Sequence, residues 1–281
     1  MSLLQGQNLS VVFKLPGGFM QAPKTLQAVN NISFELRAGE TLGVVGESGS
    51  GKSTLARCLV GMQKIEQGRV IFDGQDVSRL DTNGWRRLRR DIQMVFQDPL
   101  ASLNPRFTVG ENIAEPLINL HPELNKAQRW DKVTEMMPRV GLDPAMMNRY
   151  PHEFSGGQCQ RVGIARALVV RPRVLICDEV VSALDVTVQA QIIQLLKDIR
   201  QELNLAMIFI AHDLAVVKDI SHRVLVMEKG ELREQAETQA LFANPQHPYT
   251  QALLKAVPIP DPKAEQQRRA ERLKAAAIPA S

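Results

Sequence analysis

The chain has 281 residues, of which 44% are hydrophobic and 23% charged, and its formal net charge is only +4. This length fits one large α/β domain with an embedded subdomain, or two small domains, and the apolar content argues against general disorder. A charge excess this small and scattered gives no argument for nucleic-acid binding. The three cysteines, Cys58, Cys159 and Cys177, form no CxxC pair, which favours a reducing compartment over a disulfide framework.

Two observations bear on membranes and targeting. The first residues lack both the basic segment and the long apolar segment of a signal peptide. No apolar run approaches the length needed to cross a bilayer, since even Leu205–Ala211 has only the length of a strand. We therefore expect a protein that is soluble or peripheral to a membrane.

The first elements predicted along the chain are two strands separated by a loop rich in Pro and Gly. Asn8–Lys14 and Ile32–Leu36 have the apolar alternation of strands, with Ile32, Phe34 and Leu36 on one face. Phe13 lies near the end of the first strand. Its position suits either a core side chain or a ring that faces a purine, and spacing alone does not decide between them.

The next strand leads into a glycine-rich loop. Thr41–Val45 is apolar, Leu55–Val60 has a helical pattern, and the segment between them consists of Gly46, Glu47, Ser48, Gly49, Ser50, Gly51, Lys52, Ser53 and Thr54. This is GxxxxGK[ST] in a strand–loop–helix setting, where backbone N–H groups and the helix N-terminus attract phosphate oxygens. Lys52 would add a positive charge near the β- and γ-phosphates, and the Ser53 hydroxyl a ligand for Mg²⁺. The sequence therefore predicts a nucleoside triphosphate site.

The middle of the chain changes from strands to helices. Arg69–Asp73 and Asp91–Gln97 are predicted strands, and Gln97 is a polar residue at the end of the second. The basic run Trp85–Arg90 between them holds a single aromatic residue, which favours a solvated helix face over a nucleic-acid patch. From about residue 102 to 150 strand signals vanish, and helices are predicted at Val109–Leu117 and Lys126–Val140. We expect these helices to form a subdomain inserted into the α/β body.

In the second half of the chain, polar residues occur where predicted elements begin or end. Ser155, Gly156 and Gly157 precede a predicted helix at 159–170 and offer a second anion site, which is a weak signal by itself. The strand 173–179 ends on Asp178 and Glu179, which suggests a Mg²⁺ partner and a catalytic acid.

Three more elements are predicted toward the end of the chain. Val186–Leu203 is an amphipathic helix, and the strand Leu205–Ala211 is followed by His212, at the edge where parallel sheets form their sites. Arg223–Met227 is predicted to close the sheet.

Taken in order, these motifs resemble the ATPase subunits of ABC transporters. The matching segments are the P-loop Gly46–Ser53, the Q-loop Gln97, the signature Phe154–Gln158, the acidic motif Val174–Asp178 followed by Glu179, the D-loop Ser182–Asp185 and the switch histidine His212. The resemblance covers about residues 5 to 258. It implies an α/β P-loop NTPase fold over 1–258, with a helical subdomain inserted at about 102–165 and an antiparallel β subdomain. A charged, Ala-rich tail follows at 259–281.

The resemblance also implies a composite site. Two ATPase subunits would face head to tail, with each ATP between the P-loop of one and the signature of the other. The residues implied to bind ATP are Phe13, stacking on adenine, the loop residues from Gly46 to Thr54, the signature residues Ser155, Gly156, Gly157 and Gln158, and Asp185. Those implied to hold Mg²⁺ are Ser53, Gln97 and Asp178, and those implied to serve catalysis are Lys52, Gln97, Glu179 and His212.

Within that family, the chain is most similar to importers of oligopeptides, dipeptides and nickel. The similarity rests on stretches such as Gln93–Pro99, Tyr150–Phe154 and His247–Leu253. The loop at 16–24 resembles one of two non-identical ATPase subunits and so implies a heterodimer. The further partners implied are two transmembrane permease subunits and an extracytoplasmic solute-binding protein, with no nucleic acid, at the cytoplasmic face of the inner membrane.

Alternatives and departures from the family pattern stay open at this point. An exporter ATPase and a soluble ABC ATPase are the competing classes, whereas the signature disfavours a P-loop kinase or GTPase. Val180 stands where the family usually has proline. Cys159 stands where a long polar residue is usual, and we expect this to be a surface change.

Overall fold

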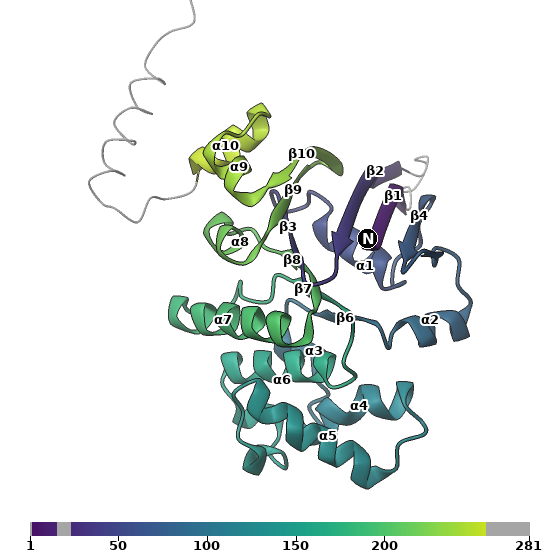
Figure 1. The fold of residues 1–281 in the computed structure, drawn as a ribbon, viewed down its shortest axis with the longest axis vertical. Helices are drawn as coiled ribbons and strands as arrows, with labels where there is room; N and C mark the ends of the chain where they lie inside the picture. Colours follow the sequence, from purple (N-terminus) through teal and green to yellow (C-terminus); the bar gives the residue numbers. More distant parts are fainter. Residues whose placement is uncertain (1, 16–23, 257–281) are drawn as a thin grey trace, which may run out of the picture.

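The computed structural model describes residues 2–15 and 24–256 (Figure 1). All but the last residue of the loop at 16–24, on which the expectation of a heterodimer rests, lies outside these residues, as does the tail at 259–281. Among the residues described, no helix is both long and apolar enough to span a bilayer.

A six-stranded sheet carries the loop that the sequence singles out, with its strands in the order β10-β9-β3-β8-β7-β6. The strands are β3 (Thr41–Val45), β6 (Ile92–Val95), β7 (Val174–Asp178), β8 (Ala206–Ile210), β9 (Arg223–Glu228) and β10 (Glu231–Glu237). All pairs are parallel except β9 with β10. Strands β3, β7 and β8 are buried along their whole length, as expected for a parallel sheet covered on both faces.

The prediction that 223–227 closes this sheet is wrong. The edge strand is β10, which follows β9 through the turn at Lys229–Gly230 and pairs with it antiparallel. Its sequence, ELREQAE, is polar because an edge strand is only partly covered, so it lacks the apolar run that marks an inner strand.

A second, antiparallel sheet has the order β2-β1-β4-β5. Its strands are β1 (Ser2–Leu15), β2 (Lys24–Arg37), β4 (Gln67–Phe72) and β5 (Gln75–Asp76). Strands β1 and β2 are longer than predicted, and irregularities in their pairing interrupt the simple alternation that sequence patterns detect. This sheet confirms the expected antiparallel β subdomain.

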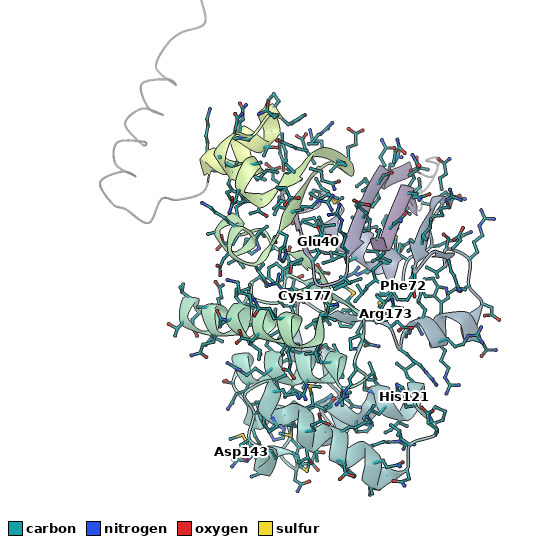
Figure 2. The ribbon with its side chains drawn as sticks, viewed as in Figure 1. Glu40, Phe72, His121, Asp143, Arg173 and Cys177 are labelled. Carbon is teal, nitrogen blue, oxygen red and sulfur yellow. The ribbon has the colours of Figure 1, made fainter. Side chains whose placement is uncertain are left out.

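Arg173 joins the two sheets just before β7 begins (Figure 2). Its guanidinium lies 5.1 Å from the centre of the Phe72 ring and forms an ion pair of 2.8 Å with Asp73. The hydrogen bond from Arg173 lowers the pKa of Asp73. The strand that leads to Asp178 and Glu179 is thus tied at its other end to the antiparallel sheet.

Helices surround the larger sheet. They are α1 (Lys52–Leu59), α2 (Thr82–Leu88), α3 (Pro99–Ser102), α4 (Val109–Leu120), α5 (Lys126–Arg139), α6 (Gly156–Leu168), α7 (Val186–Leu203), α8 (Leu214–Ile220), α9 (Thr238–Ala243) and α10 (Pro248–Ala256), with 3-10 turns at Pro144–Met146 and Pro151–Glu153. Helices α3 to α6 gather in the lower part of Figure 1. The basic run predicted as a solvated helix face falls on and after α2, and its four arginines are exposed.

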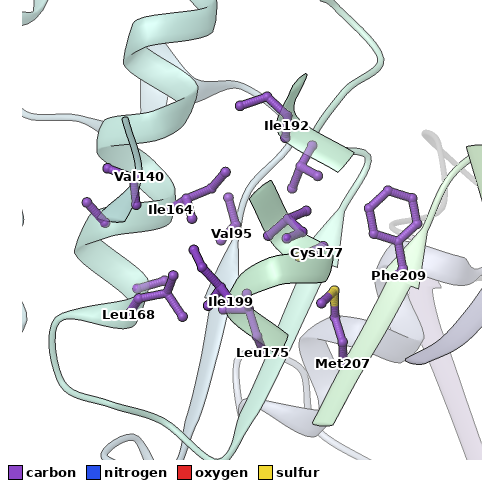
Figure 3. Packing of buried hydrophobic residues seen from close by; sticks show 14 of the residues in the cluster. Val95, Val140, Ile164, Leu168, Leu175, Cys177, Ile192, Ile199, Met207 and Phe209 are labelled. Atoms are coloured by element: carbon purple, nitrogen blue, oxygen red, sulfur yellow. The ribbon is translucent and has the colours of Figure 1, made fainter. Parts of the chain in front are cut away.

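Two apolar clusters fill the faces of the larger sheet, and alternate residues of one strand enter different clusters. Leu175 and Cys177 of β7 join the cluster shared with α4 to α8 (Figure 3). Val174 and Ile176 join the cluster shared with β1, β2 and α1. The first cluster runs without a break from the sheet to Met137 of α5. The helices of the predicted insertion therefore pack onto the sheet through shared apolar contacts.

Two expectations about α6 are wrong. The helix begins at Gly156 rather than Cys159, because Ser155 caps it. Cys159 therefore falls in the first turn on the inward face, where it is fully buried and its Sγ lies 3.4 Å from the carbonyl oxygen of Pro151. The substitution at Cys159 is a core change, and burial raises the pKa of its thiol.

Candidate nucleotide-binding site

The loop between β3 and α1 needs glycine at two positions. Gly46 and Gly51 have φ values of 151° and 100°. A Cβ atom at either residue would lie 2.1 Å from a backbone oxygen, that of Met227 for Gly46 and that of Ala28 for Gly51. Only glycine tolerates both the backbone conformation and the close approach. The loop therefore packs closely on β9 and β2, and these strands restrict its conformation.

Lys52 is buried inside this loop, with 4% of its surface exposed. Its ammonium donates hydrogen bonds of 2.8 Å to the carbonyl oxygens of Gly46 and Glu47. Burial lowers the pKa of Lys52, while the nearby Glu179 and Asp178 carboxylates act in the opposite direction. The loop thus holds a cation at its centre, next to two carboxylates at the end of β7.

Two side-chain pairs bring four of the predicted residues together. Ser53 Oγ donates to Asp178 Oδ1 at 2.9 Å. Gln97 Nε2 donates to Glu179 Oε2, also at 2.9 Å, which leaves the amide oxygen of Gln97 for another partner. Burial raises the pKa of Asp178, and the hydrogen bond from Ser53 opposes the shift. Hydroxyl, amide and carboxylate oxygens are the ligands that Mg²⁺ prefers, so these residues fit that ion.

The backbone at Glu179 is strained. Its φ is 50°, a left-handed conformation that costs free energy in a residue other than glycine. Three hydrogen bonds stabilise this conformation. The Glu179 N–H donates to the carbonyl oxygen of Ile210 in β8, and the N–H and Oγ of Ser182 both donate to the Glu179 carbonyl oxygen. The following Val180 is buried. With Val180 at this position, Glu179 is in contact with Gln97.

His212 and Asp185 lie on the loops beyond the strand ends. His212 is exposed two residues after β8, and it lines a cavity of about 40 Å³ together with Glu179 and Ser182. Asp185 caps α7 by accepting a hydrogen bond of 2.9 Å from the Val188 N–H. The structure therefore brings His212 and Glu179 to one cavity, while the contact seen for Asp185 is a helix cap.

The signature residues form the exposed start of α6. Ser155 accepts from the Gln158 N–H at 3.3 Å, and Gln158 Oε1 accepts from the Ser155 N–H at 2.9 Å, which makes a capping box. A Cβ on Gly157 would lie 2.6 Å from Val188, so this turn packs closely on α7. In Figure 1, α6 lies among the lower helices and α1 lies beside the upper sheet. One chain therefore presents the signature and the P-loop on different parts of the molecule.

Phe13 lies on β1, where it pairs with Leu26 of β2. Its ring is partly buried against the cluster that also contains residues of α1. The ring therefore packs partly as a core side chain. The stacking of Phe13 on a base stays a prediction.

Sequence reasoning missed two groups that hold the loop. The Glu47 N–H donates to the Tyr249 hydroxyl at 3.1 Å, and the Gly230 N–H donates to the Ser50 carbonyl oxygen at 3.0 Å. Both partners are more than 150 residues away in the sequence, so no local pattern could indicate these contacts.

The sheet, the loop at 46–54 and the acidic residues at the end of β7 define a P-loop ATPase cassette. The chain belongs to the ABC transporter family, whose profile matches residues 29–182. The profile described as "Oligopeptide/dipeptide transporter, C-terminal region" matches residues 233–280. The chain is thus an ATP-binding and ATP-hydrolysing subunit of this family.

Curated relatives are similar over nearly the whole chain. The oligopeptide transport ATP-binding protein OppF of Salmonella typhimurium (strain LT2) is 55% identical, over 96% of this chain and 82% of the relative. OppF of Escherichia coli (strain K12) is 54% identical over 95% and 80%. The glutathione import ATP-binding protein GsiA of Salmonella choleraesuis is 51% identical over 95% of this chain and 43% of that longer protein.

Solved structures agree with the fold. The ATP-binding cassette MJ0796, in a dimeric post-hydrolysis state bound to ADP and Pi, matches with a TM-score of 0.75 and 29% identity, covering 84% of this chain and 98% of that one. The cassette CbiO1 of Clostridium perfringens, part of the transporter complex CbiONQ, matches with a TM-score of 0.74 and 28% identity, covering 86% and 91%. These matches confirm the predicted fold class.

Proposed function

We propose that this chain hydrolyses ATP at the loop 46–54 to power the import of peptides through a membrane transporter. The convergence of the buried Lys52 with the Ser53–Asp178 and Gln97–Glu179 pairs carries the proposal. A cation, an oxygen-rich metal site and a carboxylate able to orient water are the parts that phosphoryl transfer requires. All of them meet at the carboxyl end of β7.

The roles follow from the contacts. Backbone N–H groups of the loop and the Lys52 ammonium hold the β- and γ-phosphates. Ser53 and Gln97 would hold Mg²⁺, with Asp178 reaching it through water, and the ion supplies neutralisation of phosphate charge when bound. Glu179 orients the attacking water and takes its proton, and His212, which lines the same small cavity, contacts the γ-phosphate.

A second subunit completes the site. In this proposal the exposed Ser155, with Gly156, Gly157 and Gln158, contacts ATP held by the P-loop of the partner. The helix N-terminus at Gly156 then faces the negative charge of the transferring phosphoryl group. The dimeric, ADP-bound state described for MJ0796 supports a dimer. We propose that the partner is a non-identical ATPase subunit, that Asp185 lies at their junction, and that the ring of Phe13 stacks on adenine.

The membrane partners would meet a groove next to the site. It has a volume of about 1110 Å³ and is lined by residues of α2, α4 and α6 and by the segment after Gln97. We propose that a permease subunit docks there, against the helical subdomain of about 102–165 and the segment after Gln97, at the cytoplasmic face of the inner membrane. Gln97 lines this groove and bonds Glu179, and we propose that it couples docking at the groove to the nucleotide site. Two permease subunits and an extracytoplasmic binding protein complete the proposed transporter.

Peptides are the proposed cargo because the relatives that match most of their own length are oligopeptide transport subunits. Glutathione, the cargo in the name of GsiA, is itself a tripeptide, so both names point to one chemical class. The test of cargo is uptake of labelled di- and tripeptides by vesicles that contain the complete transporter.

Glu179→Gln tests the hydrolytic role. In the assembled transporter we expect ATP still to bind and closed dimers to accumulate, while turnover falls by about a hundredfold or more, as for loss of a general base. Glu66→Gln, at an exposed residue outside the site, is the matched control and should turn over like the wild type. Normal turnover by Glu179→Gln would contradict the assignment.

Ser155→Arg tests the composite site. The bulky cation would block the ATP bound by the partner subunit while sparing ATP bound at the P-loop of the altered chain. Photo-crosslinking of labelled ATP to each subunit distinguishes the two. Loss of label from the altered chain alone would contradict a site shared between subunits.

A further inference from the structure

A residue near the end of the described chain, Tyr249, makes a hydrogen bond to the start of the nucleotide loop. The Glu47 N–H donates to the hydroxyl of Tyr249 in α10 at 3.1 Å. Nearby, the Gly230 N–H in the turn between β9 and β10 donates to the Ser50 carbonyl oxygen. Two elements of the C-terminal region thus hold the loop at Glu47 and at Ser50, although both lie more than 150 residues further along the chain.

The Tyr249 hydroxyl has a fixed position. The turn before α10 is clamped by the Glu234 carboxylate, which accepts from the N–H groups of Gln246 at 2.9 Å and His247 at 3.0 Å. His247 Nδ1 then accepts from the Tyr249 N–H at 3.1 Å. The ring packs against the first apolar cluster, and burial raises the pKa of Tyr249, so the hydroxyl is neutral at pH 7. The contacts of the turn before α10 therefore position the Tyr249 hydroxyl as the acceptor for the Glu47 N–H.

The bond to Tyr249 acts on the same peptide unit that holds the catalytic cation. The carbonyl of Gly46 and the N–H of Glu47 belong to one planar peptide group. Its carbonyl oxygen accepts from Lys52 Nζ at 2.8 Å, and its N–H donates to Tyr249 at 3.1 Å. Rotating this peptide would break both bonds together. Because Gly46 lacks a side chain to restrain such a rotation, the bonds to Tyr249 and to Lys52 oppose it, and of the two only the Tyr249 bond comes from outside the loop.

We propose that Tyr249 is a positioning residue for nucleotide binding: it fixes the Gly46–Glu47 peptide, and through it the ammonium of Lys52. This inference rests on the proposed role of the loop in binding ATP. It gives the C-terminal region a function at the nucleotide site, because displacement of α10 would free the peptide that orients Lys52. Tyr249 itself touches neither phosphate nor metal in this account.

Tyr249→Phe removes only the hydroxyl and keeps the ring in its packing. We expect the full chain to bind a fluorescent ATP analogue about fivefold more weakly, because the ligand must then order the Gly46–Glu47 peptide that one neutral hydrogen bond holds in the free chain. In the assembled transporter the KM for ATP should rise by a similar factor, with kcat little changed. Hydrogen exchange at the Glu47 amide should become faster. Tyr150→Phe is the matched control, because Tyr150 is partly exposed and lies outside the site.

The outcomes separate this inference from the function on which it rests. Unchanged affinity in Tyr249→Phe would overturn it, even if the variant melts at a lower temperature, because a purely structural hydroxyl alters stability alone. Unchanged exchange at the Glu47 amide would overturn it as well. Lys52→Ala serves as the reference: if that variant bound the analogue like the wild type, the proposed nucleotide site itself would be wrong.

Discussion

Charge balance at single residues shapes the nucleotide site. Lys52 is buried, and an isolated buried ammonium would lose much of its hydration. Two carbonyl oxygens accept hydrogen bonds from its ammonium, and Asp178 and Glu179 lie near enough to favour its charged form. In the proposed function, a bound triphosphate would add further negative charge at the same point. One cation would then be stabilised by the loop without ligand and would hold the phosphates when ATP binds.

The three thiols give a prediction at this scale. Cys58, Cys159 and Cys177 are all buried, and burial raises the pKa of each, for Cys58 to about 12. Because the thiolate is the reactive form, the native chain should resist a thiol reagent at pH 8, whereas the chain in guanidinium should react at all three positions. Rapid labelling of Cys159 in the native protein would contradict the buried position found for it.

At the scale of elements, the start of α6 serves two purposes. Ser155 satisfies the Gln158 N–H as a helix cap, and it is also the residue proposed to meet the ATP of the partner. A polar cap is worth about 1 kcal/mol relative to alanine. Any loss of activity on removing this hydroxyl therefore combines a folding effect with a binding effect, and the two need separate measurement.

We expect Ser155→Ala to lower the free energy of unfolding by about 1 kcal/mol, and Ser155→Thr to keep most of it. Thr108→Ala, which breaks the similar capping box of α4, is the control: it should cost about the same stability and leave ATP turnover unchanged. Denaturant unfolding measures the first effect, and ATPase assays of the assembled transporter measure the second. Wild-type stability in Ser155→Ala would show that the cap contributes nothing.

Local signals explain which elements could be predicted. The predicted bounds of α7 agree with the structure because Asp185 is a strong cap and Asn204 ends the helix in a left-handed conformation. The start of α6 was missed because two glycines disfavour a helix, and tertiary packing of Gly157 against Val188 overrides that preference. Strand β10 was missed because a polar edge strand has no apolar pattern.

The candidate site shows the same division. The loop motif is one continuous segment, and the two acids at the end of β7 are neighbours in sequence. Each could therefore be recognised as a candidate from a local pattern. The Gln97–Glu179 bond joins residues 82 apart, and the Glu47–Tyr249 bond joins residues 202 apart. Pairings of this kind depend on how sheets and helices pack, which a single sequence does not encode in any local pattern.

At the scale of the whole molecule, the larger sheet separates the two apolar clusters, which form two cores. Alternate residues of β7 pack against the helices on one face and against the antiparallel sheet on the other. The nucleotide loop lies at the end of the larger sheet and is braced by β2, β9 and α10. Because the elements that hold the loop belong to both cores, we expect ligand binding at the loop to stabilise the folded chain as a whole.

This gives a prediction for the full chain. A ligand that binds only the folded state at a hundred times its Kd adds about 2.7 kcal/mol to the free energy of unfolding. We expect ATP with Mg²⁺ to raise the melting temperature of the wild type and of Glu179→Gln alike, since that variant still binds. Lys52→Ala, which loses the central cation, should show no shift. A shift in Lys52→Ala equal to that of the wild type would mean that nucleotide stabilises the chain at some other place than the loop between β3 and α1.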